Sequence, residues 1–495
     1  MKSRTLMCVT AMTLFAALAL PVPLAAQHTR YKLIDLGTFG GPSSGFVGVG
    51  THPLNNRGVA TGGADTATPD PFAPNCFGDC FVQHTFRWQN GVLTDLGALP
   101  GVNSGGGPND INANGVITGI STNGGPVDPI TGVPEFNAVV WKDGQIIKID
   151  TFGGNFSYAN AINDRDQVAG FALNATPDSS GFADLCMNPP FGQQARAFIW
   201  ENGVTKKLGT LGGPDSCALW INQKGQAAGH SFTNSTPNAT TGIPTVDPFL
   251  WDHGTMLDLG TLGGTFGIAA WLNSRGQVVG QSSLAGDFLF HPFLWDHGVL
   301  TDLGTLGGDI GEAIRANDAG EVVGDADLPG SENHHAFLWR NGVMKDLGTL
   351  GSTSFALAIN SKGQVVGRSR IGPVTEPLQH AFLWEHGGPM IDLNTFVPLG
   401  LDLTLTEATF INDRGEISVQ GFLPNGDTRA VLLVPCGGGE EGCQIATEGA
   451  TAVTQNNLVP QRRRTPSGIM AAWRARMAQR YHISASERQG ISRCG

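Results

Sequence analysis

Three residues could do chemistry because of their types and their places in a repeated pattern: Trp220, Trp271 and Arg315. Each stands two positions before an asparagine that recurs along the chain. In the other repeats the same position holds Pro53, Asp110, Ala161, Ala358 and Phe410. Two indole rings beside a guanidinium can stack on a sugar ring and hold a neighbouring group by charge. If these side chains are exposed together, the sequence predicts a binding platform for a carbohydrate or another polymer.

A purely structural role would explain the same three residues. Two positions before each of them the chain carries a small residue, at Ala218, Ala269 and Ala313. Because side chains alternate between the two faces of a strand, each alanine is expected on the face of its large neighbour. Large and small side chains would then compensate in size where neighbouring sheets pack.

Catalytic candidates are fewer. Asp309 and Glu312 lie close to Arg315 in the sequence and could act as acid and base on a glycan. A solvated loop explains these residues without any chemistry, and we prefer that interpretation. The sequence contains no Gly-x-Ser-x-Gly elbow, His-Glu-x-x-His helix, phosphate loop or dinucleotide fingerprint. Binding is therefore favoured, and a glycan hydrolase or lyase is kept as the alternative.

Metal ligands have two weak sources in the sequence. Four repeats carry a histidine at the same position, namely His84, His291, His335 and His380. They could line an axial site if their strands lie nearest the centre, but a hydrogen bond at the start of a strand fits better. Other repeats replace them with Asn137, Arg196 and Arg429. Asp325, Asp327 and Glu332 are too few for calcium, which takes six or more oxygens, so we predict no metal and no cofactor.

The elements that must position these residues repeat along the chain. A Trp-x-x-Gly pattern recurs seven times, with its tryptophan at Trp88, Trp141, Trp200, Trp251, Trp295, Trp339 and Trp384. The last three spacings are 44, 44 and 45 residues. Such a period is typical of propellers, solenoids and repeat arrays. Within a unit such as 335–370, short apolar runs flank turn residues, which predicts four strands per unit.

Two kinds of turn join these strands. The first has glycine after Asn, Asp or His, as in Asn341-Gly342, and suits a hairpin whose two central residues need positive φ. The second is an Asn-x-x-Gly turn in which the asparagine side chain is expected to cap the backbone. Its asparagines are Asn55, Asn112, Asn163, Asn222, Asn273, Asn317, Asn360 and Asn412.

The two ends of the repeat region are incomplete units. Residues 31–66 lack a first strand, and residues 429–434 supply a first strand with nothing after it. Joining the two fragments would remove two exposed sheet edges. We therefore predict an all-β, eight-bladed β-propeller of four-stranded repeats, with a composite blade closed by the N- and C-terminal segments. A seven-bladed propeller and a linear β-repeat array are the alternatives.

Connections between units vary much more than the turns within them. The segments 64–83, 174–195 and 231–247 are long, whereas 283–290 is short. In a propeller these connections and the Gly-Gly loops emerge on the same face. Insertions gathered on one face usually mark the working surface.

The ends of the chain differ in character from the repeats. Residues 1–27 combine two basic residues, an apolar stretch and small residues, as in a cleavable export signal. No later stretch is apolar enough for a transmembrane helix, so we expect a secreted or extracellular protein, with a periplasmic location left open. The repeat domain 28–436 is followed by a flexible linker, 437–466, and a basic tail, 467–495, with a short amphipathic helix.

The cysteines predict disulfides, and the distribution of charge excludes one class of partner. Cys76 with Cys80 and Cys436 with Cys443 are expected to form local disulfides, and Cys186 with Cys217 is a further candidate pair. The net charge of −12 arises in the repeats, which are acidic, whereas the tail is basic. An acidic body argues against nucleic acid as a partner.

The run His-Ala-Phe-Leu-Trp at 335–339 and again at 380–384 resembles the HAF repeats of probable extracellular bacterial proteins. The supporting Asp-Leu-Gly-Thr-Leu-Gly pattern recurs at 258–263, 302–307 and 346–351. The resemblance covers most of 31–434 and implies export and repetition, but no catalytic residue. We expect a secreted binding or scaffolding module whose ligand is an extracellular polysaccharide or a protein partner.

Overall fold

The structure is a computed structural model that describes residues 29–46, 51–71, 81–100, 107–129, 132, 134–178, 186, 192–239, 241–330, 333–372, 378–437 and 442–444. These residues form 32 strands and one 3₁₀ helix, η1 (Leu393–Phe396), so the described chain is all-β. It contains no helix that is long and apolar enough to pass through a bilayer. The predicted export signal, the Cys76 and Cys80 pair and the predicted C-terminal helix lie outside the described residues.

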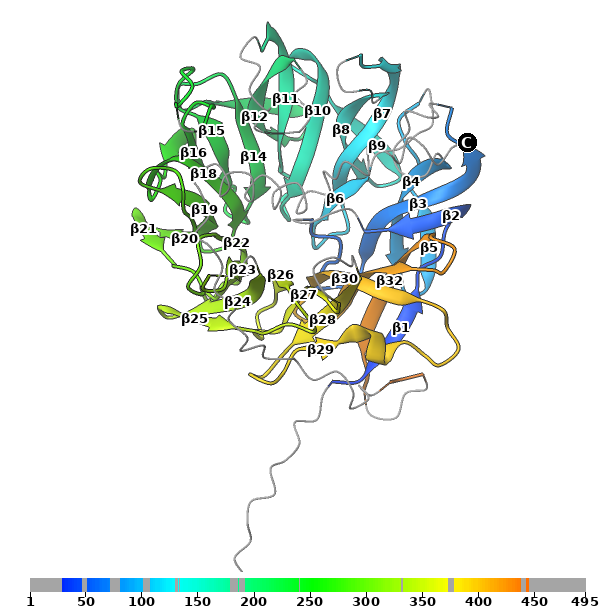
Figure 1. Cartoon of the computed structure of the whole chain (residues 1–495). Coiled ribbons are helices and arrows are strands. Elements are labelled where there is room, and N and C mark those ends of the chain that lie inside the picture. Colours follow the sequence, from blue (N-terminus) through cyan, green and yellow to red (C-terminus); the bar gives the residue numbers. More distant parts are fainter. Residues whose placement is uncertain are drawn as a thin grey trace, which may run out of the picture.

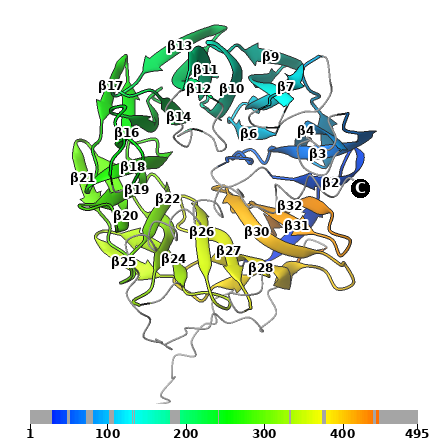
Figure 2. The same cartoon turned by 45° about the horizontal axis from the view of Figure 1, so that its top comes forward.

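Most strands belong to four-stranded antiparallel sheets that surround a centre (Figures 1 and 2). Five of these sheets follow the chain order: β2 (Gly40–Gly45), β3 (Ala60–Pro69), β4 (Phe81–Gln89) and β5 (Val92–Asp95); β6 (Pro108–Ile111), β7 (Ile117–Val127), β8 (Pro134–Lys142) and β9 (Gln145–Ile149); β10 (Gly153–Ile162), β11 (Val168–Pro177), β12 (Gln193–Glu201) and β13 (Val204–Gly209); β22 (Gly311–Ala316), β23 (Val322–Asp327), β24 (His334–Arg340) and β25 (Val343–Asp346); β26 (Ser354–Ile359), β27 (Val365–Arg370), β28 (Gln379–Trp384) and β29 (Ile391–Asp392).

One larger sheet has eight strands: β14 (Ser216–Ile221), β15 (Ala227–Phe232), β16 (Val246–Asp252), β17 (Thr255–Asp258), β18 (Gly263–Leu272), β19 (Val278–Leu284), β20 (Phe290–Asp296) and β21 (Val299–Asp302). A single parallel bridge between Val246 and Phe266 joins its two antiparallel halves. Each half has the strand order of the smaller sheets. Among the described residues, no sheet closes on itself.

The two ends of the repeat region meet in one further sheet, here called the composite sheet. It consists of β1 (Tyr31–Asp35), β32 (Thr428–Pro435), β31 (Ile417–Phe422) and β30 (Thr404–Ile411). β1 pairs with β32 in an antiparallel register that sets Leu33 opposite Leu433. The predicted joining of the N- and C-terminal segments is confirmed. Outside β1, Gln444 bridges to Tyr31, so residues 442–444 of the predicted linker lie against this sheet.

Both kinds of turn have the predicted geometry. The two central residues of every Trp-x-x-Gly hairpin have positive φ, for example 51° at Asn341 and 83° at Gly342. In the Asn-x-x-Gly turns, the asparagine Oδ1 accepts from the backbone N–H groups two and four residues later. For Asn222 these bonds, from Lys224 and Gln226, are 3.0 and 3.1 Å long. The predicted capping role of the turn asparagines is confirmed.

The same asparagines also link neighbouring sheets. Each Nδ2 donates to the backbone carbonyl of the next turn asparagine, at 2.9 to 3.2 Å: Asn55 to Asn112, Asn112 to Asn163, Asn163 to Asn222, Asn222 to Asn273, Asn273 to Asn317, Asn317 to Asn360, Asn360 to Asn412, and Asn412 to Asn55. The last bond returns to the first residue, so the eight bonds form a closed cycle. We call these residues the asparagine ring.

We call β6, β10, β14, β18, β22, β26 and β30 the inner strands, because they lie nearest the centre in Figures 1 and 2 and end at the asparagine ring. Each contains a β-bulge three residues before its asparagine, where its register shifts against the next strand. In six of them the bulge faces a glycine. A Cβ on Gly324, for example, would lie 1.9 Å from the carbonyl oxygen of Glu312, so only glycine fits there.

The bulge overturns the expectation that Ala313 and Arg315 share a face. Ala313 pairs with Gly324, whereas Arg315 pairs with Val323, the next residue back along the partner strand. Paired residues share a face and successive residues do not, so Ala313 and Arg315 point to opposite sides. The same shift separates Ala218 from Trp220 and Ala269 from Trp271. Size compensation on one face was therefore the wrong alternative.

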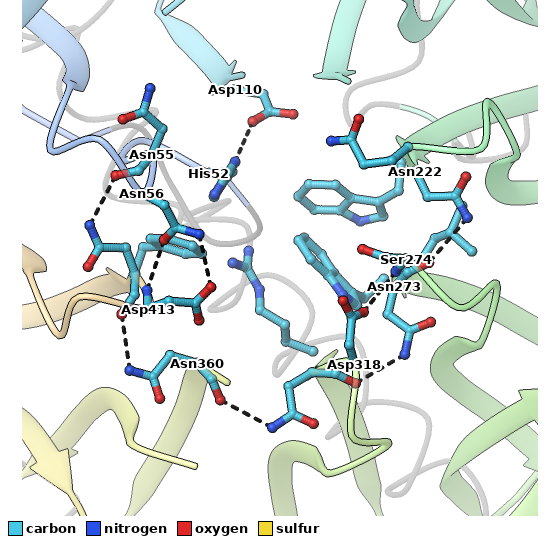
Figure 3. Close-up of a pocket in the computed structure, with 18 of the residues that line it drawn as sticks. His52, Asn55, Asn56, Asp110, Asn222, Asn273, Ser274, Asp318, Asn360 and Asp413 are labelled. Carbon is cyan, nitrogen blue, oxygen red and sulfur yellow. Dashed lines mark hydrogen bonds and ion pairs between the residues drawn. The ribbon is translucent and has the colours of Figure 1, made fainter. Parts of the chain in front are cut away.

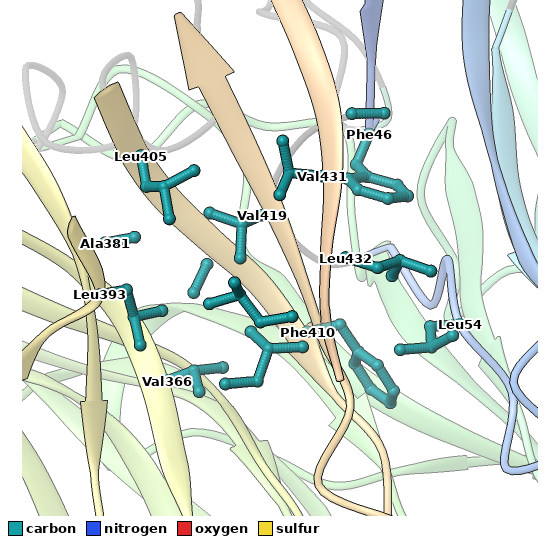
Figure 4. Packing of buried hydrophobic residues seen from close by; sticks show 14 of the residues in the cluster. Phe46, Leu54, Val366, Ala381, Leu393, Leu405, Phe410, Val419, Val431 and Leu432 are labelled. Carbon is teal, nitrogen blue, oxygen red and sulfur yellow. The ribbon is translucent and has the colours of Figure 1, made fainter. Parts of the chain in front are cut away.

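The core lies between neighbouring sheets, and the inner strands are buried on both faces, as in β22 and β26. Around the composite sheet, side chains from β27, β28, β30, β31 and β32 meet in one cluster (Figure 4). Leu432 and Leu54 belong to this cluster, as do Ala381 and Leu393. Burial on both faces fixes the inner strands, so residues at their ends are held in place.

Candidate functional site

A cavity of about 310 Å³ opens at the asparagine ring, where residues from every sheet line it (Figure 3). All three predicted site residues line this cavity: Trp220 from β14, Trp271 from β18 and Arg315 from β22. Each follows the bulge of its inner strand. Bulges re-aim side chains and are common next to functional sites, and here they turn the three residues toward one space.

The three predicted residues touch one another. The ring centroids of Trp220 and Trp271 are 4.2 Å apart with 60° between their planes, so the rings are tilted and do not form a flat platform. The guanidinium of Arg315 lies 4.0 Å from the Trp271 centroid and 5.7 Å from that of Trp220. Trp220 Nε1 donates to the Ala270 carbonyl at 2.5 Å, which fixes this ring.

Arg315 is a buried cation with few partners. Its side chain is only 2% exposed, and its Nη2 donates to the Thr51 carbonyl at 3.1 Å. Nε and Nη1 have no hydrogen-bond partner among the described residues. Burial lowers the pKa of Arg315 to about 9, while the nearby carboxylate of Asp110 opposes this shift. The guanidinium therefore stays charged at neutral pH but poorly compensated, which is costly in a protein interior.

The opposite wall of the cavity holds residues that sequence reasoning did not assign to the site. His52 Nδ1 lies 2.8 Å from Asp110 Oδ1, and Asp110 Oδ2 accepts from the Ile162 N–H at 2.8 Å (Figure 3). The Phe410 ring contacts both His52, at 4.5 Å, and the Arg315 guanidinium, at 4.8 Å. His52 was missed because the aligned position in its repeat is Pro53, one residue later. Asp110 and Phe410 do occupy the aligned position, two residues before the turn asparagine, but they were not assigned to the site.

The repeated histidines lie elsewhere. They sit on β4, β20, β24 and β28, the third strands of their sheets, and do not line the cavity. The expectation that these strands are nearest the axis was wrong. Each histidine Nδ1 instead meets the aspartate of its own hairpin: His84 with Asp95, His291 with Asp302, His335 with Asp346 and His380 with Asp392, at 2.6 to 2.9 Å. The preferred hydrogen-bonding role is confirmed.

The proposed acid and base are not part of the cavity. Arg315 lines the cavity, but Asp309 and Glu312 do not; Glu312 is at the other end of β22 and Asp309 precedes this strand. Asp325 and Asp327 are buried in β23, and Glu332 lies outside the described residues. In the part of the chain that the structure describes, no three His, Cys, Asp or Glu side chains are grouped to hold a metal ion.

The variable connections leave the sheets at the end opposite the cavity. β26 runs from Ser354 to the asparagine turn at 360, and β27 runs back to Arg370, where the connection to β28 begins. The asparagine ring and the long connections thus mark opposite faces. One connection is tied to an inner strand by a disulfide between Cys186 and Cys217, and a second disulfide joins Cys436 and Cys443. Both predicted pairs are confirmed.

Comparison with known proteins adds little. No model of a protein family matches the chain, and no curated protein sequence does. Among solved structures, Porphyromonas gingivalis dipeptidyl peptidase 4 is 10% identical with a TM-score of 0.45, over 80% of this chain but only 60% of that one. A polysaccharide lyase, an ulvan lyase, is 9% identical with a TM-score of 0.36, over 81% of this chain and 96% of that one. At these values neither similarity assigns a function.

Proposed function

We propose that the protein is an exported, eight-bladed β-propeller whose central cavity binds a sugar residue of an extracellular polysaccharide. The eight-bladed architecture is supported by the asparagine ring, which passes through eight turns before it returns to Asn55. It is also supported by the composite sheet, which joins both ends of the repeat region. Export is supported by the sequence of residues 1–27 and is compatible with the two disulfides. The HAF-repeat resemblance stays a prediction.

The binding function depends on one observation: among the described residues, Arg315 Nε and Nη1 have no partner, beside Trp271 in a cavity that every sheet lines. Native proteins rarely keep a buried donor without a partner, so such groups call for an explanation. A cavity with aromatic walls and a few convergent polar groups is typical of small-ligand sites. Its volume of about 310 Å³ suits one or two sugar units, the scale of a chain segment rather than a folded protein.

Binding is tested on an array of extracellular polysaccharides with the full mature chain. Trp271→Phe keeps a ring in the cavity but removes the indole edge and its N–H, so retention should fall at least several-fold. Trp251→Phe is the matched control, because Trp251 is buried in β16 under Lys206 and does not line the cavity. If no polysaccharide is retained, or if both variants bind like the parent chain, the proposed function is wrong.

Cleavage of the bound glycan is the second candidate, and the pairing of His52 with Asp110 favours it. A histidine oriented by a buried carboxylate can serve as a general base or acid. A product assay for new reducing ends or unsaturated sugars separates the two functions. Turnover that is lost in His52→Gln would establish catalysis. Retention without any product supports binding alone.

A further inference from the structure

We infer that the cavity takes the terminal unit of an acidic glycan, with an oxyanion of that sugar at Arg315. The oxyanion is the carboxylate of a uronic acid or a sulfate ester. This inference rests on the proposed function and adds two properties to it: the charge of the ligand, and the part of the polymer that is recognised. Each property follows from a separate observation.

The charge follows from the hydrogen-bonding groups of the cavity. Among the described residues, the buried side-chain atoms of its lining that lack a partner are Trp271 Nε1 and Arg315 Nε and Nη1. All three are N–H donors. Among the described lining residues no buried side-chain acceptor lacks a partner, since each turn asparagine Oδ1 receives two backbone N–H groups and Asp110 has both oxygens bonded. A ligand that completes this set must bring acceptors, and charged acceptors form the strongest bonds with a guanidinium.

Electrostatics favour the same ligand. Burial shields the Arg315 charge from water, so its field acts across the cavity with little screening. Asp110 is the one carboxylate among the buried lining residues, and it is bonded to His52 and to the Ile162 N–H. The rim carboxylates of Asp164, Asp318 and Asp413 each accept a backbone N–H from the neighbouring turn and stay charged, but they are exposed, so water and salt screen their repulsion of an anion.

Pairing with Arg315 requires a small local change. Nε and Nη1 are buried beside the Trp271 and Phe410 rings, so the guanidinium must turn toward the cavity to meet an anion. The long side chain of arginine allows this movement, and its planar fork matches two oxygens of one anion. Among the described residues, one hydrogen bond holds it, from Nη2 to the Thr51 carbonyl at the outer end of the side chain.

Recognition of a chain end follows from the closed asparagine ring. The ring surrounds the mouth of the cavity with backbone and side chains from every sheet. A polymer that lies across a groove can bind by its middle, but a pocket that is walled on all sides admits a linear chain by its end. The sugar in contact with Trp271 and Arg315 is therefore a terminal one.

The test measures binding to the full mature chain by isothermal titration calorimetry. The probes are sodium glucuronate, sodium galacturonate, glucose 6-sulfate, glucose and the methyl ester of galacturonate. We expect the acidic sugars to bind at least 10-fold more tightly than glucose or the ester. Arg315→Met should remove this preference, a loss of about 10- to 100-fold for the acids. Arg340→Met is the control, because the Arg340 side chain is 68% exposed, pairs with Glu321 and does not line the cavity.

Fragments of an acidic polymer test the second property. Oligogalacturonides of increasing length compete for the protein against a labelled trimer. End recognition predicts that half-displacement depends on the molar concentration of chains, whatever their length. Dependence on total sugar mass would show that internal units bind, and would overturn this part.

The outcomes separate the inference from the function on which it rests. Equal binding of acidic and neutral sugars, unchanged in Arg315→Met, overturns the inference and leaves polysaccharide binding intact. If the sulfate binds and the uronates do not, the oxyanion is a sulfate ester, and the reverse result identifies a carboxylate. If no sugar of either kind binds, both proposals are wrong. Thermal unfolding of each variant shows whether a loss of binding reflects a loss of folding.

Discussion

The turn asparagine and the residue two positions before it lie less than a strand apart, yet they behave in opposite ways. The asparagine is the same in all eight turns and makes the same bonds to the backbone in each. The other position changes from one inner strand to the next, and carries Trp220, Trp271, Arg315, Asp110 or Phe410 where it lines the cavity. The constant position builds the architecture, and the variable position sets which side chains line the cavity.

The difference has a physical origin. Each asparagine must satisfy its own turn and the next one, so a change at one turn affects its neighbour. The residue after the bulge lies at the central cavity in five of the inner strands, where it contacts other variable side chains. Substitutions at the two kinds of position should therefore have different consequences, and the following predictions test this contrast from the largest effect to the smallest.

The glycine opposite the bulge should be the most sensitive element of the constant framework. In Gly324→Ala the new Cβ would lie 1.9 Å from the Glu312 carbonyl oxygen, a backbone atom that cannot move without disturbing β22. We expect a loss of about 3 kcal/mol or more in the free energy of unfolding, measured by urea denaturation. Gly298→Ala is the control, since its φ of 89° is strained for alanine but its Cβ meets no atom within 4 Å. It should cost only about 1–2 kcal/mol.

The asparagine ring should come next. Asn412→Ala removes the bond to the Asn55 carbonyl at 3.0 Å and the bond to Glu416 at 2.7 Å, and it frees two backbone N–H groups of its own turn. Leaving these buried groups unpaired should cost about 2–4 kcal/mol in urea denaturation. Asn425→Ala, in an exposed turn bonded to Asp427, should cost less than about 1 kcal/mol. Equal losses would mean that the ring adds nothing beyond an ordinary turn.

Much of this framework could be predicted from the sequence, because its signals are local. Asn341-Gly342 requires positive φ, and an Asn-x-x-Gly turn requires a side-chain cap, so both turns follow from residue types alone. The pairing of β1 with β32 followed from counting the strands at each end. Which strand of a sheet lies nearest the centre could not be predicted in this way. The repeat has the same period whichever strand is taken as its first. For this reason the strands that carry the histidines were expected nearest the axis, in place of the inner strands.

The site was predictable in part. The variable position identified Trp220, Trp271 and Arg315, but simple alternation put the preceding alanines on the same face because the bulge was not recognised. A signal for it exists: Gly324 and its equivalents, such as Gly229, Gly280 and Gly367, stand opposite the bulge in the aligned repeats. The pairing of His52 with Asp110 had no such signal, because it joins two separate sheets.

The variable position should tolerate change better than the framework, and one substitution there should stabilise the protein. Arg315→Met removes a buried charge whose Nε and Nη1 have no partner, at the expense of a cation–π contact with Trp271. Burial lowers the pKa of Arg315 to about 9, which reflects how unfavourable the charge is there. We expect a gain of about 1–2 kcal/mol in urea denaturation. Exposed Arg340→Met should stay within about 0.5 kcal/mol, and a clear loss in Arg315→Met would assign the arginine a structural role.

The pairs of histidine with aspartate in the hairpins are a second repeated feature, and one hairpin carries two aspartates in their place. At the position of His291, the preceding repeat carries Asp247, whose partner Asp258 corresponds to Asp302. Two carboxyl groups thus replace a histidine and a carboxylate. Burial, and then the proximity of Asp258, raises the pKa of Asp247 to about 7. In contrast, burial raises the pKa of Asp302, but the hydrogen bonds from His291 and the Gly304 N–H and the charge of His291 together lower it below its usual value.

The exception should make stability depend on pH. A carboxyl with a native pKa near 7 and an ordinary unfolded pKa binds more protons when folded, so stability is full at acidic pH and falls as pH rises toward 7. Asp247→His should restore the usual pair, flatten the profile of melting temperature between pH 4.5 and 8, and raise the melting temperature at pH 8. The reciprocal variant His291→Asp should introduce a similar decline in the neighbouring hairpin. The effects should be the smallest of the series, because Asp258 is exposed. If the melting temperatures of the parent chain and both variants change with pH in parallel, the two hairpins contribute equally to the pH dependence and the prediction is wrong.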